Sequence, residues 1–204
     1  MQARSTTWLW MVSAFAAAAV LAAIVLAVFG AGKLGTVVAL QISARFSFLI
    51  FWLAYAGGGL VELLGPAAQP LQRHGRDFGL AFAAAHLVHV ALVVWLCWIG
   101  GTPAMEVFKF FLPPLATVYI LALFSIGSLQ QMLGHTLWRV LRTVGMTYIA
   151  YAFAADFVSA PLGGDTKHII MYSSFAVLSV IGPVLHAISF APPLWRARRA
   201  TDRV

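Results

Sequence analysis

Charged residues and cysteine are both scarce in this sequence. Only 9% of its 204 residues are Asp, Glu, Lys or Arg, whereas a typical soluble domain carries about a quarter. The single cysteine, Cys97, excludes an internal disulfide and a metal site of paired cysteines. No hydrophilic stretch is long enough to fold as a flavin, nucleotide or sensor domain. The composition therefore excludes the classes of water-soluble globular protein.

Apolar residues dominate instead and make up 62% of the chain. A helix that crosses the hydrocarbon layer needs about 20 mostly apolar residues, because the layer is roughly 30 Å thick and each residue rises about 1.5 Å. Six segments bounded by Gly and Pro meet this requirement. They cover approximately residues 8–29, 46–64, 78–99, 107–125, 137–158 and 168–190. The sequence therefore predicts an all-α integral membrane protein, a bundle of six transmembrane helices that forms one domain over residues 1–204 in the lipid bilayer.

The distribution of Lys and Arg predicts the orientation of this bundle. Nine of these residues fall on one side of the predicted spans, and four fall on the other. The four are Lys33, Arg45, Lys109 and Lys167. Because cytoplasmic loops are enriched in positive residues, both termini are predicted to be cytoplasmic in a multi-pass protein of a bacterial inner membrane. The formal charge of +7 then reflects orientation, not nucleic-acid binding.

Residues 191–204 form a basic tail that this orientation places in the cytoplasm. One interpretation is a stop-transfer anchor that fixes the last span. The other is a binding site for anionic lipid or a partner protein.

Ionisable residues inside the predicted spans are few, and each is a candidate functional residue because a charge in the bilayer is costly. His86 and His89 lie well inside the third span, and residues three apart share a helix face. Neutral imidazole binds heme iron and other transition metals, so both are candidate cofactor-binding residues. The alternative is that each is hydrogen-bonded to a neighbouring helix.

Two further candidates lie toward the cytoplasmic ends of predicted spans. His186, near the inner end of the sixth span, marks either the membrane interface or a ligand. Arg142, in the first turns of the fifth span, could hold an anionic headgroup or a heme propionate, or act as a positive-inside anchor. Glu62 and Asp156 are the acidic residues that could pair with it.

Three short motifs in the middle of the chain share their spacing with a known membrane family. The stretch Arg76-Asp-Phe-Gly-Leu-Ala-Phe is followed by His89, ten residues after Gly79. The other two are Ser43-Ala-Arg-Phe-Ser-Phe-Leu, and Ser128, Leu133-Gly134 and Trp138 within residues 121–141. Together they resemble the ferric-reductase-like transmembrane domain family, especially the heme-binding membrane subunit of the bacterial methionine sulfoxide reductase system.

The resemblance implies a heme-dependent oxidoreductase subunit that carries electrons through b-type heme, with His89 as the metal ligand. A quinol or flavoprotein would be the electron donor, and a partner membrane or periplasmic protein would be the electron acceptor. The family's fifth helix carries two more axial histidines, and those positions hold Arg142 and Ala155 here. His86 and His186 remain as candidates for a second ligand. The alternative is a heme-free descendant that acts as a structural or assembly subunit of a membrane complex.

Overall fold

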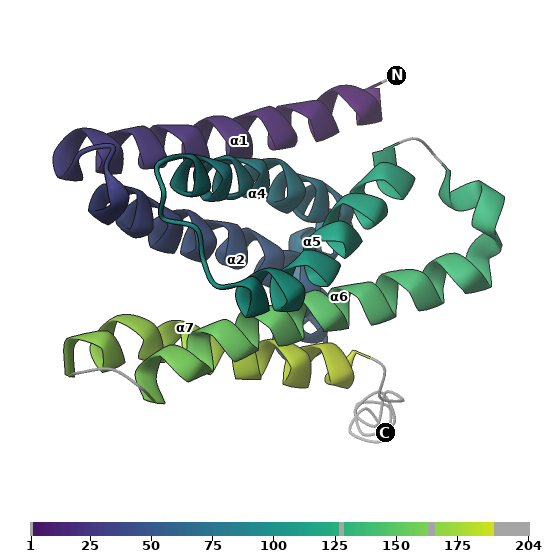
Figure 1. Ribbon diagram of the computed structural model, residues 1–204. Coiled ribbons are helices and arrows are strands. Elements are labelled where there is room, and N and C mark those ends of the chain that lie inside the picture. The colour runs from purple at the N-terminus through teal and green to yellow at the C-terminus, as the bar shows by residue number, and fades with distance from the viewer. Residues whose placement is uncertain (1, 127–128, 163–165, 190–204) are drawn as a thin grey trace, which may run out of the picture.

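The computed structural model describes residues 2–126, 129–162 and 166–189, with side chains for 6–126, 129–159 and 172–189. All regular structure in this part of the chain is helical (Figure 1). The helices are α1 Gln2–Phe29, α2 Lys33–Leu64, η1 Gly65–Ala68, α3 Gln69–Arg73, α4 Gly75–Trp98, α5 Met105–Ile126, α6 Gln130–Leu162 and α7 Thr166–Ile188. The prediction of an all-α protein is confirmed. The basic tail predicted at residues 191–204 lies outside the described residues.

Four described segments are long and apolar enough to cross a membrane. They are Thr6–Phe29, Lys33–Arg73, Gly75–Trp98 and Met105–Ile126. The fifth predicted span, 137–158, falls within α6, and the sixth, 168–190, overlaps α7. The part of α7 with described side chains, Tyr172–Ile188, is a shorter apolar helix. Several long apolar helices are compatible with a multi-pass membrane protein, as the composition predicted.

Helix α2 begins earlier than the sequence predicted. Gly30, with φ 81°, ends α1, and Thr36 Oγ1 donates to the Gly32 carbonyl at 2.9 Å in the first turn of α2. The segment 33–45, predicted to be a connecting loop, is therefore helical. Only two charged residues, Lys33 and Arg45, interrupt the apolar sequence of this segment. They are too few to end a helix. Arg45, counted above as a loop residue, consequently lies within the bundle.

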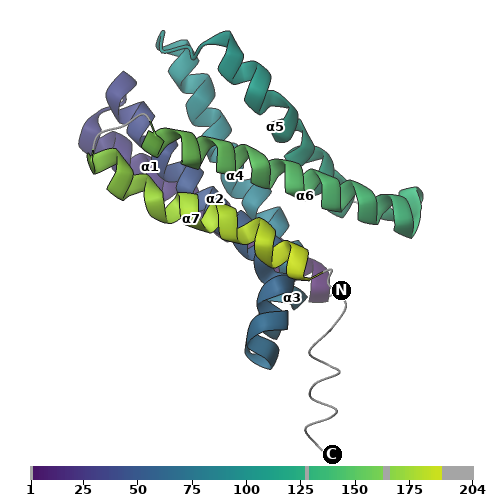
Figure 2. The same ribbon diagram turned by 90° about the horizontal axis from the view of Figure 1, so that it is seen from below.

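Helix α2 is the middle element of the fold, since it packs against α1, α4 and α7. Figure 1 shows α1 and α7 on opposite sides of it, and Figure 2 shows α6 beside α7. Small side chains fill the seam of α1, α2 and α4, where they let the backbones approach closely. Rings fill the seam of α2, α4, α6 and α7. The buried members of this second group include Phe48, Phe51, Phe82 and Phe157.

Helices α2 and α7 meet closely at Gly59. A Cβ at this position would overlap the carbonyl oxygen of Leu185. One side of the same crossing is tied by a hydrogen bond from Trp52 Nε1 to the Leu178 carbonyl oxygen, at 2.9 Å. The glycine therefore sets how near α7 can come to α2.

We expect Gly59→Ala to lower the free energy of unfolding by roughly 1–3 kcal/mol, because the added methyl forces the two helices apart. Gly79→Ala is the matched control, since its Cβ would meet nothing within 4 Å. It should be neutral or stabilising by up to about 1 kcal/mol, because Ala favours helix. Chemical denaturation in detergent, followed by tryptophan fluorescence, measures both variants. Equal stabilities would contradict the close contact.

Candidate cofactor site

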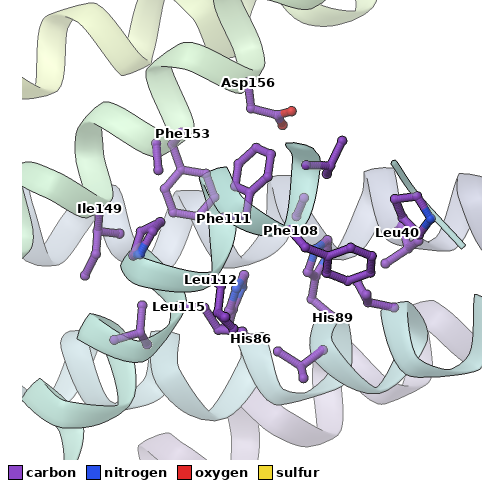
Figure 3. A pocket seen from close by; sticks show the side chains of 18 of the residues that line it. Leu40, His86, His89, Phe108, Phe111, Leu112, Leu115, Ile149, Phe153 and Asp156 are labelled. Carbon is purple, nitrogen blue, oxygen red and sulfur yellow. The ribbon is translucent and has the colours of Figure 1, made fainter. Parts of the chain in front are cut away.

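A cavity of about 570 Å³ lies between α2, α4, α5, α6 and α7 (Figure 3). This volume is within the range of roughly 300–1,000 Å³ that is usual for cofactor and small-molecule sites. Most of its wall is aliphatic or aromatic. The polar and ionisable side chains that line it are Gln41, His86, His89, Asp156 and Tyr172. The structure thus brings the two predicted histidines of the third span to one largely apolar cavity.

His89 is hydrogen-bonded to α2 through Ser43. Its Nδ1 lies 3.0 Å from the Oγ of Ser43, and that hydroxyl lies 3.0 Å from the Leu40 carbonyl oxygen, to which it donates. In the tautomer that satisfies both contacts, the single hydroxyl proton goes to Leu40 and Ser43 accepts from Nδ1–H of the imidazole. Nε2 is then the nitrogen with a free lone pair. A hydrogen bond of this kind at the far nitrogen fixes the ring of a metal-ligating histidine.

His86 has a different environment, although it lies on the same helix. Its ring stacks on that of His89, with centroids 5.0 Å apart and planes at 14°. It also contacts the rings of Phe82 and Phe153. Its Nδ1 is buried and, among the described residues, has no hydrogen-bond partner. A buried polar group left in this state costs roughly 1–3 kcal/mol, which makes His86 the residue of the cavity with most to gain from a ligand.

The stacked rings limit how the cavity can hold heme. Both imidazoles rise from α4 on one side, whereas Phe153 and Asp156 of α6 lie across from them (Figure 3). Two ligands on one side cannot serve as opposite axial ligands of one iron. The described residues of this cavity would therefore offer one imidazole to a heme iron, and His89 is the one whose ring is hydrogen-bonded to a neighbouring helix. Within this same part of the chain, no three His, Cys, Asp or Glu side chains are grouped to hold a bare metal ion.

His186 and Arg142 lie in a second cavity, of about 450 Å³. His186 Nδ1 lies 3.2 Å from the Tyr55 carbonyl oxygen, and the two rings stack with centroids 4.2 Å apart. Ser43 and Tyr55 are twelve residues apart in α2, which is about 18 Å of helix. His186 is therefore displaced along the bundle from His89. It does not line the same cavity, and the side chain of His168 is outside the described residues.

Two residues of the site escaped the sequence reasoning as functional side chains. Ser43 orients His89, and the guanidinium of Arg45 lies 4.5 Å from the centre of the Tyr172 ring, which lines the cavity. Nε and Nη2 of Arg45 are buried without a hydrogen-bond partner in the described region, and Asp156 is within electrostatic range. Both residues precede the predicted start of the second span. A helix predicted to start at residue 33 would have included both residues in the second span.

No family model, curated protein or solved structure matches this chain. The likeness to ferric-reductase-like proteins therefore depends on the three motifs in the sequence. The chemistry of the cavity depends on the side chains that line it. His89 belongs both to the first motif and to the lining of the cavity.

We expect His86→Leu to raise the stability of protein purified without added heme by about 1–3 kcal/mol, because it removes a buried nitrogen that lacks a partner. His89→Leu is the comparison, since it breaks the bond to Ser43 and leaves that hydroxyl with one partner fewer. It should be neutral or destabilising. Thermal unfolding in detergent ranks the two variants against the wild type. A destabilised His86→Leu would mean that the ring has a partner in the folded protein.

Proposed function

We propose that this chain is a ferric-reductase-like membrane protein that carries electrons across a bacterial inner membrane through b-type heme. The observation that carries the proposal is His89, whose Nδ1 is occupied by Ser43 so that Nε2 is left for a metal in a cavity of about 570 Å³. A porphyrin already surrounds its iron with nitrogen ligands. One protein imidazole is therefore enough to attach it.

The residues around His89 suit the binding of such a group. Ser43 holds the imidazole and makes Nε2 a better electron donor, as outer partners of metal-bound histidines do. The apolar walls exclude water from the ligand, and heme, when bound, supplies one-electron chemistry. Asp156 lines the cavity and is within electrostatic range of Arg45, whose guanidinium lies over the ring of Tyr172. Charged side chains near a heme would adjust its reduction potential without binding the iron.

The electron donor and acceptor would come from outside the chain. A quinol or a flavoprotein is the proposed donor, and a membrane or periplasmic protein is the proposed partner on the other side. The proposed arrangement has six spans with both termini in the cytoplasm. It is supported by the excess of Lys and Arg on one side, which becomes larger once Arg45 is removed from the minority.

The alternative function is a heme-free structural or assembly subunit of a membrane complex. The specific observation in its favour is the facing wall of the cavity, where Phe111, Phe153 and Asp156 lie in place of an imidazole (Figure 3). Arg142 occupies a position where the family has an axial histidine, and it lines the second cavity. In this interpretation the aromatic cluster and the close helix contacts maintain a helical scaffold that no longer binds heme.

Visible spectroscopy separates the two functions. Wild-type protein from heme-replete cells should show a sharp b-type band in the dithionite-reduced minus oxidised spectrum. His89→Ala should lose it, and His186→Ala should retain it because His186 lines the other cavity. Ser43→Ala should weaken heme binding by about 10–100-fold, as loss of an outer partner does. Colourless wild-type protein would favour the structural subunit.

The orientation is tested by cysteine labelling in a Cys97→Ser background. Thr102 and Gln72 are both exposed, and they lie at opposite ends of α4. Thr102→Cys should react with a membrane-impermeant maleimide in intact spheroplasts, whereas Gln72→Cys should react only after permeabilisation. The reverse pattern would place the termini outside.

A further inference from the structure

The second cavity is cationic, whereas the first is largely apolar. Three arginines line it, Arg76 from α4 and Arg139 and Arg142 from α6. Its other polar side chains are Tyr55, Gln72, Ser125, Gln130, Trp138, Thr143, His186 and Ser189. No Asp or Glu is among the described residues that line it. An excess of guanidinium groups without carboxylates predicts an anionic ligand.

The arginines approach the cavity from two sides. Arg139 and Arg142 are three residues apart and so share a face of α6. Arg76 is fixed on the other side, where its Nη2 donates to the Ser125 carbonyl oxygen at 2.6 Å near the end of α5. All three side chains are exposed, so their charged ends are accessible at the mouth. A phosphate between them could accept paired hydrogen bonds from planar guanidinium groups.

The depth of this cavity is apolar. Phe82, Val118 and Ile149 form its floor and also line the larger cavity on their other side. Leu121 and Met146 extend the apolar wall toward the mouth. A ligand that fills the whole volume must therefore have an anionic head and a hydrocarbon portion. A soluble anion such as free phosphate would leave the apolar depth unused.

We propose that the cavity of Arg76, Arg139 and Arg142 binds the phosphate headgroup of an anionic phospholipid, with part of an acyl chain against Phe82 and its neighbours. Anionic headgroups of the cytoplasmic leaflet attract arginines at this level of a membrane protein. Gly57 and Gly58 of α2 also line this cavity. This site does not require heme in the larger cavity.

The test uses the full chain in a neutral detergent and two lipids with identical acyl chains, phosphatidylglycerol and phosphatidylcholine. Native mass spectrometry should show phosphatidylglycerol retained in preference to phosphatidylcholine. Arg142→Gln should weaken its binding by about tenfold, which is the effect of losing one charge-assisted hydrogen bond. Arg73→Gln is the matched control, since Arg73 is an exposed cation at the same end, bonded to Gln69, that does not line the cavity.

Three outcomes would overturn the site. Equal binding of the two lipids by wild-type protein would do so even if a variant failed to fold. An equal loss in Arg73→Gln and Arg142→Gln would show that attraction is spread over the surface. The third experiment compares the thermal stability of the protein with inorganic phosphate and with phosphatidylglycerol at the same concentration. Equal stabilisation by the two would exclude a lipid as the occupant.

Discussion

A hydrogen bond between two apolar helices determines the chemistry of the larger cavity. The Oγ of Ser43 in α2 contacts both the Leu40 carbonyl and Nδ1 of His89 in α4, and both contacts are satisfied when the hydroxyl donates to Leu40 and accepts from His89. In hydrocarbon surroundings neither group can turn to water instead, so the arrangement persists only while the two helices stay in register. Their close packing, through small side chains such as Ala39 and Ala85, keeps that register. The free nitrogen of His89 therefore depends on the fold as a whole.

The two cavities divide the bundle into parts of different chemistry. Phe82, Val118 and Ile149 separate them and close the larger cavity from the arginines of the smaller one. On one side, imidazoles and rings suit a neutral or metal-bearing planar ligand. On the other, guanidinium groups at an open mouth suit an anion.

The hydrophobic runs of the sequence predicted the helical class, and each of the six predicted segments overlaps one long helix. Hydropathy could not find the start of α2, because two isolated charges mimic a loop, and this error hid Ser43 and Arg45. The pair His86 and His89 was predicted from its spacing, which one helix fixes locally. The position of His186 was not, because its level relative to His89 depends on how α7 lies along α2.

The most direct measurement is ¹⁵N NMR of histidine-labelled, heme-free protein in a bilayer, with His89 assigned by substitution. The account predicts that, without heme, Nδ1 of His89 carries the proton and Nε2 is unprotonated, and that the imidazole signals of His89 are displaced or broadened when heme is added. A proton on Nε2, or a spectrum of His89 that heme leaves unchanged, would contradict it.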